Sequence, residues 1–310
     1  MGEVKIKRMG NLSVDFIVPT LNINPERIVE CKNSILTQKE KFKINIFIEK
    51  GSSFTKSVNR GIRKGKGQYV ALINDDVILT PTWLDEAIKI LEMNKRCAAV
   101  ATRVLSFDGV YIDSCGMDYK IIGRAIKRGN GLIESKLLFS KVEEVFGVPC
   151  SAALFKREPL IKAGLFDEKF YAYLEDVDLS FRLRLMGYTL FFAPKSIAFH
   201  LGEATSSLFG NLKSMMDARN WFYIIVKNYP LNIIKSNFDE IFLERLKNLS
   251  GLIKDTIQKY GWRSVWVLPV SVAFVFGAIL RRFPKLISDR KKIQNTRKIR
   301  DDEIETWMKD

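Results

Sequence analysis

The first hundred residues alternate between short apolar runs and longer segments in which polar and apolar positions mix at helical spacing. The apolar runs are Val14–Val18, Ile44–Ile48, Tyr69–Ile73 and Ala98–Val104. Each has the length and residue types of a strand. Strands that alternate with helices at this spacing are typical of βαβ units, so the pattern predicts an α/β fold with a parallel sheet and right-handed crossovers.

Helix start signals occupy the segments between these runs. Asn24 is suited to an N-cap and Pro25 to the first helical position. The Thr80–Pro81 pair is the same kind of signal. Helices are therefore expected from Asn24–Pro25 onward, from Phe54 to about Lys64, and from Thr80–Pro81 to about Met93.

The second half of the chain has a different pattern. Residues 105–160 are richer in glycine and mixed in pattern, as a substrate-contacting half often is. A helix is expected from about Glu175 to Met186, and Gly187 is suited to end it. The elements expected after it are strands at Thr189–Phe192 and Ser196–Phe199, and helices at Leu212–Asn228, at about Asn237–Lys259 and from Trp262.

One uncharged stretch, Val265–Leu280, lies between Arg263 and the pair Arg281–Arg282. It contains Pro269 and is shorter than the ~20 apolar residues that a membrane-spanning helix needs. A spanning helix, a buried helix and a helix lying on a membrane surface all remain open. The basic residues that follow favour the surface helix, because anionic lipid headgroups attract such charge.

Composition restricts the class of protein. The chain has 310 residues, of which 47% are hydrophobic and 27% are charged. This balance excludes a disordered chain, collagen and a disulfide scaffold, and the length allows one large domain or two. The four cysteines form no CxxC pair and the N-terminus has no apolar signal segment, so we expect a reducing, cytoplasmic compartment.

The net charge of +15 is concentrated in two places. From Arg281 to Arg300 there are nine basic residues and one acid. A second cluster runs from Lys50 to Lys66 with no acid inside it. Such runs are often solvated faces, but a surplus of this size also points to an anionic partner: a nucleic acid, a phosphorylated small molecule or an anionic membrane.

A candidate ligand site follows the third apolar run. Asn74, Asp75 and Asp76 come directly after it, where ligands bind at the carboxyl ends of parallel strands. Carboxylates there suit Mg²⁺ or Mn²⁺, which bridge to phosphates. The alternative is a polar turn, since Asn and Asp favour turns. No GxxxxGK[ST] sequence is present, which excludes a P-loop.

Three segments taken together resemble a known family. They are VDFIVPTLN, NRGIRKGKGQYVALINDD and GVPCSAALFKREPLIKAGLFDEKFYAYLEDVDLSFRLRLMGY, and they occur in the order expected for a family 2 glycosyltransferase of the GT-A fold. The sequence is most similar to the rhamnosyltransferase-like branch. The resemblance covers roughly residues 13–230 and implies a Rossmann-like nucleotide-binding sheet with a mixed acceptor half. A C-terminal helical, basic region is expected over residues 231–310.

The resemblance assigns residues to the donor site. Asp76 is implied as the direct ligand of a divalent metal, Mn²⁺ or Mg²⁺, on the donor diphosphate. Asn74 and Asp75 are implied beside it, with Asp75 near the ribose or the water shell of the metal. The remaining nucleotide-binding candidates are Thr20, Asn22, Glu49, Asn59 and Arg60. Among them Glu49 replaces the usual Asp, and Arg60 suits phosphate oxygens.

Three further residues are implied in catalysis or metal binding. Asp176, in the sequence Glu-Asp-Val-Asp, matches the general base that deprotonates the acceptor in an inverting transfer. Read without the family, acids there would simply complement a helix N-terminus. His200, the only histidine, matches a residue that completes the metal or diphosphate site. Arg219 matches a residue on the following helix within reach of phosphate.

The resemblance therefore implies an inverting, metal-dependent glycosyltransferase of cell-surface polysaccharide synthesis. The donor expected is a nucleotide sugar, with dTDP-L-rhamnose first and a UDP-hexose or UDP-HexNAc as alternatives. The acceptor expected is a glycan or a polyprenyl-linked saccharide, reached from the inner face of the cell membrane by a peripheral enzyme. Nucleic acid becomes the least favoured partner. The GxGTRLxP start of a sugar nucleotidylyltransferase is absent from the sequence, which disfavours that enzyme class. A non-catalytic basic protein that binds a membrane or RNA remains the other class.

Overall fold

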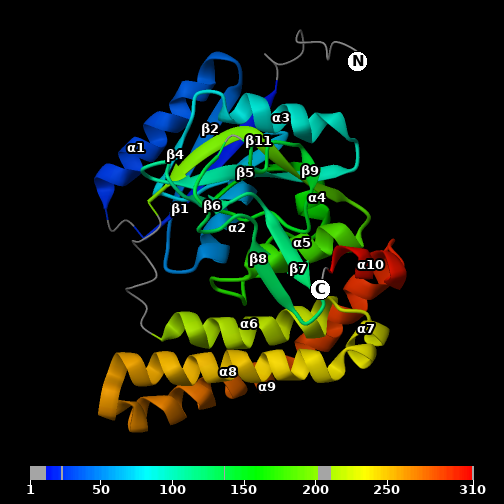
Figure 1. Cartoon of the computed structure of the whole chain (residues 1–310). Helices are drawn as coiled ribbons and strands as arrows, with labels where there is room; N and C mark the ends of the chain where they lie inside the picture. Colours follow the sequence, from blue (N-terminus) through cyan, green and yellow to red (C-terminus); the bar gives the residue numbers. More distant parts are fainter. Residues whose placement is uncertain (1–11, 22–23, 136, 202–210, 309–310) are drawn as a thin grey trace.

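The computed structural model describes residues 12–21, 24–135, 137–201 and 211–308 (Figure 1). The strands are β1 Ser13–Thr20, β2 Lys43–Lys50, β3 Tyr69–Ile73, β4 Val77–Leu79, β5 Cys97–Ser106, β6 Ile112–Ser114, β7 Met117–Lys120, β8 Arg124–Lys127, β9 Glu143–Glu144, β10 Ala152–Lys156 and β11 Thr189–His200. The helices are α1 Pro25–Leu36, α2 Phe54–Lys64, α3 Trp83–Met93, α4 Arg157–Lys162, α5 Glu175–Leu185, α6 Leu212–Asn228, α7 Leu231–Ser236, α8 Phe238–Tyr260, α9 Ser264–Thr296 and α10 Asp301–Trp307, with short 3₁₀ turns η2 Thr37–Glu40 and η3 Gly261–Arg263.

The main sheet has the order β2-β1-β3-β10-β5-β11-β4, with β6 and β9 paired at its margins. Strands β2, β1 and β3 are parallel, as the sequence pattern predicts. Between β3 and β5, however, the chain inserts β10, which is antiparallel to both. Strands β3 and β5 therefore run in the same direction on either side of β10, and β11 is parallel to β5. The four strands predicted from the first hundred residues share one direction, but the reversed strands β10 and β4 make the sheet mixed.

The two strands expected near residue 190 form one strand. β11 runs from Thr189 to His200 and pairs with β5 along its length, with an irregularity between Ala193 and Ile197. Pro194 and Lys195 fall in this irregularity, so the polar gap in the sequence marks a bulge rather than a loop. His200, at the end of this strand, lies beside Val77 of β4.

The structure confirms two of the predicted helix ends, one capped by a side chain and one by a glycine. The Asn24 side chain accepts hydrogen bonds from the backbone N–H groups of Glu26 and Arg27, at 3.1 and 3.3 Å. Gly187 has φ +85° just after α5, as a residue that ends a helix should. Helix α3, in contrast, begins at Trp83 rather than at the expected Thr80–Pro81 pair.

The alternating side chains of the central strands build two hydrophobic cores. In β1, Phe16 and its alternate neighbours pack with α1 and α3, while Ile17 faces α2 and α5. Because both faces are covered, the central strands are mostly apolar, and the buried carboxylate of Asp15 in β1 is paired with Arg157. Since helices cover both faces of the sheet, polar groups collect at the carboxyl edge of β1 and β3.

The C-terminal helices form a layer along one side of the molecule (Figure 1). Helix α6 packs against α8 and α9, and Gly261, with φ +52°, lies at the turn between α8 and α9. Helix α10 then returns to the sheet half, where Met308 forms a β-bridge with Tyr119. The proposed division at residue 230 therefore separates α6 from helices with which it shares a core.

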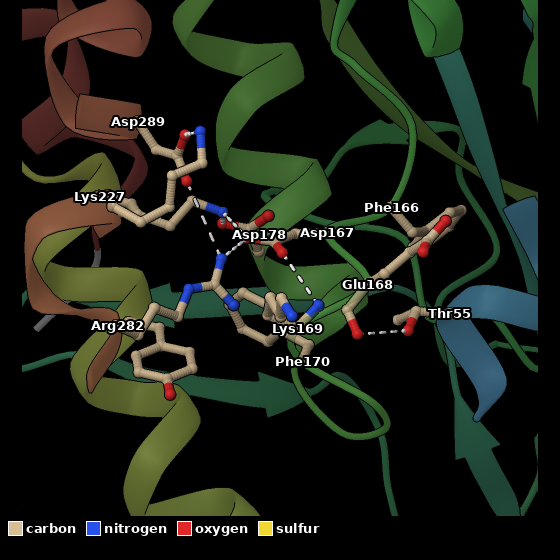
Figure 2. A network of polar contacts seen from close by, with 12 residues as sticks. Thr55, Phe166, Asp167, Glu168, Lys169, Phe170, Asp178, Lys227, Arg282 and Asp289 are labelled. Carbon is tan, nitrogen blue, oxygen red and sulfur yellow. Dashed lines mark hydrogen bonds and ion pairs between the residues drawn. The ribbon is translucent and has the colours of Figure 1, made fainter. Parts of the chain in front are cut away.

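Part of the basic run Arg281–Arg300 serves this packing. Arg282 is buried and forms an ion pair with Asp167, and Lys227 binds both Asp167 and Asp178 at 2.7 and 2.9 Å (Figure 2). Arg290 donates a hydrogen bond to the carbonyl of Val226 at 2.8 Å. The run is thus in part an internal tie between α9 and the rest of the fold. The exposed basic residues of α9 are Arg281, Lys285, Lys291 and Lys292.

Candidate active site

A cavity of about 460 Å³ lies at the carboxyl edge of the parallel strands. Its walls come from the ends of β1 and β3, the segment after β2, the hairpin β7–β8, the start of α5, the end of β11 and the first turns of α6. Six residues singled out from the sequence line it: Thr20, Asn74, Asp75, Asp76, Asp176 and His200. Groups separated by up to 180 positions in the chain thus face one space.

The acidic turn after β3 is held by backbone hydrogen bonds on both sides. The N–H of Asn74 donates to the carbonyl of Ser151 at 2.9 Å, and the N–H of Leu201 donates to the carbonyl of Asp76 at 3.1 Å. The hydroxyl of Thr20 donates to the carboxylate of Asp75. Burial raises the pKa of Asp75, the Thr20 hydrogen bond lowers it, and the Asp76 charge raises it, for a net increase.

The imidazole of His200 lies between two carboxylates. Its Nε2 is 3.3 Å from Oδ1 of Asp76, and its Nδ1 is 3.5 Å from Oδ2 of Asp113. Burial alone would lower the pKa of this imidazole, but the two carboxylates outweigh burial and raise it to about 9. His200 is therefore a cation at neutral pH when no metal competes for Nε2.

Glu175 and Asp176 form the first turn of α5 and face the cavity. Oε2 of Glu175 is buried and has no hydrogen-bond partner among the described residues. Burial, then the charge of Asp176, raises the pKa of Glu175 to about 8. Burial also raises the pKa of Asp176, whose Oδ1 accepts a hydrogen bond from the N–H of Val177 at 2.8 Å. Underpaired buried carboxylates in a cavity are a mark of functional sites.

The loop before α5 is conformationally strained. Four of its non-glycine residues have positive φ: Leu165, Tyr171, Tyr173 and Leu174, between 62° and 69°. Strain of this kind persists only where surrounding structure imposes it, and it gathers at functional sites. Tyr171 through Val177 line the cavity, so this loop sets where Asp176 points.

Two of the predicted nucleotide-binding residues hold this loop. Asn59 is buried and exchanges hydrogen bonds with the backbone N–H and carbonyl of Phe166, at 3.0 and 2.8 Å. Arg219 donates to the carbonyl of Phe170 at 2.9 Å, and the adjacent Asn220 donates to three loop carbonyls. Neither Asn59 nor Arg219 lines the cavity. Their contacts indicate that they position the loop.

Glu49 and Arg60 pair with each other away from the cavity wall. Arg60 forms an ion pair with Glu49 and donates to the carbonyl of Lys50 at 2.6 Å. Burial would raise the pKa of Glu49, but hydrogen bonds from Arg60 and Lys64 lower it overall. The segment beyond β2 does reach the cavity, through Gly51 and Ser52. Asn22, the remaining predicted residue, lies outside the described residues.

The structure adds three charged residues that the sequence did not reveal. Arg27 and Lys127 line the cavity, and Asp113 lies behind His200. The Arg27 guanidinium makes no ion pair or hydrogen bond within the described part of the chain. Arg27 follows an ordinary helix start, and Asp113 and Lys127 occupy the glycine-rich stretch 105–160, so no local pattern distinguishes them.

The donor set at Asp76 and His200 fits a divalent metal. A carboxylate oxygen and an imidazole nitrogen 3.3 Å apart on one cavity wall are suitable ligands for Mn²⁺. No cluster of three or more His, Cys, Asp or Glu ligands occurs within residues 12–21, 24–135, 137–201 and 211–308. The remaining ligands of such an ion would have to come from a bound phosphate or from water.

Comparisons with known proteins agree with this geometry. The model of the family "Glycosyl transferase family 2" matches residues 40–164, less than half of the chain. No curated protein matches the sequence.

Two solved structures are similar in fold. The first is the mannosyltransferase PcManGT from Pyrobaculum calidifontis in complex with GDP-Man and Mn²⁺, with a TM-score of 0.51 and 14% identity over 91% of this chain and 85% of that one. The second is GalNAc-T7 with UDP, GalNAc and Mn²⁺, with a TM-score of 0.50 and 11% identity over 81% of this chain and 57% of that one. The fold is therefore the GT-A fold of glycosyltransferases with a C-terminal helical region, and residues 40–164 match glycosyltransferase family 2.

Proposed function

We propose that this protein is an inverting, metal-dependent glycosyltransferase that moves a sugar from a nucleotide sugar to a hydroxyl of a glycan or lipid-linked saccharide. The observation that carries the proposal is the cavity in which Asp76, His200 and Asp176 converge from three distant segments. Its volume suits a small-molecule ligand. The match to glycosyltransferase family 2 supports the same reaction class.

Asp176 is the general base of the proposed reaction. Its carboxylate accepts the proton of the acceptor hydroxyl as that oxygen bonds to the anomeric carbon of the sugar. The bond from that carbon to the diphosphate breaks, and the nucleoside diphosphate leaves with the electron pair. A direct displacement needs one base and inverts the anomeric centre, unlike the two-carboxylate reactions of glycosidases. The raised pKa of Asp176 makes it a stronger base than a solvated aspartate.

Asp76 and His200 would hold the divalent metal, with Asp75 beside them. When bound, Mn²⁺ or Mg²⁺ neutralises negative charge on the departing diphosphate. Arg27 and Lys127 add two positive charges to the cavity walls, where phosphate oxygens need them. Arg27 replaces Arg60 as the cation we assign to the diphosphate, because Arg60 is paired with Glu49 and Lys127 is paired with Asp113.

A panel of nucleotide sugars tests the proposal. The full chain is incubated with each donor and Mn²⁺ or Mg²⁺, and release of nucleoside diphosphate and protection against heat are measured. Turnover of one donor that stops in a chelator supports the proposal. Absence of release and of protection with every donor, together with salt-sensitive RNA binding, would instead favour a non-catalytic basic protein.

The same panel decides the donor. We propose dTDP-L-rhamnose on the sequence resemblance alone. A UDP-hexose or UDP-HexNAc is the alternative, and GDP-mannose is included because one similar structure contains it. The sugar that gives the largest kcat/KM identifies the donor.

We further propose that the enzyme works on the inner face of the cell membrane, held by α8 and α9. Within the described residues, one helical stretch, Phe238–Thr296, has a window apolar enough to cross a membrane, with 11% of it buried. Gly261 breaks this stretch into two helices, which favours lying on the surface. Exposed apolar side chains recur at four-residue spacing on α9 and its preceding turn: Trp262, Trp266, Val270 and Phe274.

Helix α8 also carries exposed apolar side chains. Phe238, Phe242 and Leu246 are exposed along α8 at four-residue spacing. Exposed basic residues lie on both sides of the apolar stretch of α9. Arg263 precedes it, and Arg281 and Lys285 follow it. Apolar side chains beside exposed cations are typical of segments that bind anionic lipid surfaces.

Vesicle binding tests the membrane proposal. The double variant Trp262→Ser/Trp266→Ser should bind anionic phosphatidylglycerol vesicles roughly 10-fold or more weakly than the unaltered protein. Each tryptophan that moves from water into the membrane contributes a favourable transfer free energy, which serine does not provide. The control is Met93→Ser, which removes an exposed apolar side chain from α3. Equal binding of the double variant and the control would overturn the proposed surface, as would equal affinity for neutral phosphatidylcholine.

A further inference from the structure

A chain of charged groups runs from Lys127, on the wall of the cavity, through Asp113 to the candidate metal site. Lys127, at the end of β8, contacts both carboxylate oxygens of Asp113, at 3.0 and 3.1 Å. Asp113 in turn contacts Nδ1 of His200, whose Nε2 faces Asp76. Asp113 itself does not line the cavity, so the imidazole separates it from any ligand there.

The fold brings these groups together from non-adjacent strands. Asp113 lies in β6, which pairs with β5, and β5 pairs on its other side with β11, where His200 ends the strand. Asp113 thus reaches the imidazole of His200 across β5. The side chain of His200 is 13% exposed and that of Asp113 is 21% exposed, so both are shielded from most of the solvent.

We propose that Asp113 is a positioning residue, which holds the imidazole of His200 with Nδ1 toward itself and Nε2 toward Asp76, ready to bind a divalent cation. The inference rests on the metal site of the proposed function. A carboxylate on the second nitrogen of a ligating histidine fixes its tautomer and orientation and strengthens it as a ligand. Lys127 keeps Asp113 in place by contacting both of its oxygens.

The single histidine makes the experiment direct. Because His200 is the only histidine, its imidazole gives one set of nuclear magnetic resonance signals that needs no further assignment. Mn²⁺ alone is titrated into the labelled full chain, and the concentration that half-broadens these signals is measured. Asp113→Asn and Asp113→Ala should raise that concentration about 10- to 100-fold. The control Asp108→Asn, in the turn that precedes β6, should leave it unchanged.

A second measurement needs no metal. Long-range ¹⁵N spectra at a pH above the imidazole titration report which nitrogen carries the proton. The unaltered protein should show the proton on Nδ1, and Asp113→Ala should show a mixture of both forms. Asp113→Asn, the milder change, serves if the alanine variant does not fold.

The two measurements distinguish an error in the proposed metal site from an error in the proposed role of Asp113. If Mn²⁺ does not broaden the His200 signals in the unaltered protein, the metal site of the proposed function is wrong, and the tautomer alone then decides the role of Asp113. If the proton is on Nε2, or if the Asp113 variants keep the tautomer and the Mn²⁺ response of the unaltered protein, the positioning role is wrong.

Discussion

Asp176 and Asp178 lie two residues apart in the first turn of α5, yet their surroundings are opposite. Asp176 faces the cavity, where burial raises its pKa and its carboxylate accepts a hydrogen bond from the backbone N–H of Val177. Asp178 faces the core, where Lys227, Arg182 and Asn228 surround it. Burial alone would raise the pKa of Asp178, but Lys227 and Arg182 lower it.

The difference separates function from structure within one sequence motif. Asp178 belongs to a network with Asp167, Lys227 and Arg282, which links α5, α6 and α9 (Figure 2). A buried carboxylate with several cationic partners stabilises the fold when all partners are present. A buried carboxylate without such partners is costly, and its retention at a cavity indicates a chemical role. Acids at a helix start therefore need not share one explanation.

The largest effect is expected on activity, from Asp176→Asn. An amide cannot accept the proton of the acceptor hydroxyl, so kcat should fall by about 10²- to 10⁴-fold. Binding of the nucleotide sugar and the melting temperature should stay close to those of the unaltered protein, because Asp176 forms no ion pair with a described residue. Turnover is measured with the donor that the panel identifies. An active Asp176→Asn protein would rule out the assigned base.

The same substitution two residues later should act on stability. Asp178→Asn removes one partner of Lys227 and of Arg182 and should cost about 3–5 kcal/mol of unfolding free energy. Since the pKa of Asp178 is lowered in the folded state, this stabilisation is present above its unfolded pKa and is lost as the pH falls through the folded pKa. The difference from the unaltered protein, measured by denaturant unfolding, should thus shrink in acid. Unchanged stability near pH 7 would contradict the comparison.

The comparison also shows what the sequence could reveal. Strands β1, β2 and β3 and the start of α1 follow from local patterns, because apolar runs and the Asn24 cap act over a few residues. Asp76, Asp176 and His200, to which the family resemblance gave metal-binding and catalytic roles, line one cavity, and their roles stay predictions. Strand β10 could not be predicted, because its antiparallel place between β3 and β5 depends on pairing with distant strands.

The charged residues were the least predictable part. Arg282 pairs with Asp167 across 115 positions, and nothing near Arg282 distinguishes it from the exposed cations around it. Arg60 lies in a basic cluster that suggested phosphate binding, but its nearest acid is Glu49 on the adjacent strand. A run of basic residues in the sequence shows where cations occur. The acid with which each cation pairs depends on the tertiary fold and cannot be read from the run.

A smaller loss of stability is expected from Arg282→Met. Asp167 would keep Lys227 as a cationic partner, so we expect a cost of about 1.5–3 kcal/mol, the value of hydrogen bonds to charged groups. Unfolding is followed by circular dichroism and by tryptophan fluorescence. Four of the five tryptophans lie in the C-terminal helical region, and Trp83 lies in the core of the sheet half. Because Arg282 joins α9 to the loop before α5, both probes should shift together. Separate transitions would mean that the helical layer and the sheet unfold independently.

The last effect is expected from Glu175→Gln, and it should depend on pH. The folded protein holds a proton on Glu175 up to its raised pKa of about 8, whereas the unfolded chain releases it near 4.5. The folded state therefore binds one more proton across this window, and the unaltered protein loses stability as the pH rises through it. Glutamine cannot ionise and avoids that loss.

The melting temperature of Glu175→Gln relative to the unaltered protein should therefore rise between pH 5 and pH 8, by on the order of 2–4 °C for each kcal/mol avoided. Asp178→Asn provides the matched control, because the pKa of Asp178 is shifted in the opposite direction. Its deficit should change in acid and stay constant across pH 5 to 8. A flat profile for Glu175→Gln would mean that Glu175 is ionised in the folded protein, and the contrast between the cavity and the core carboxylates would then rest on Asp176 alone.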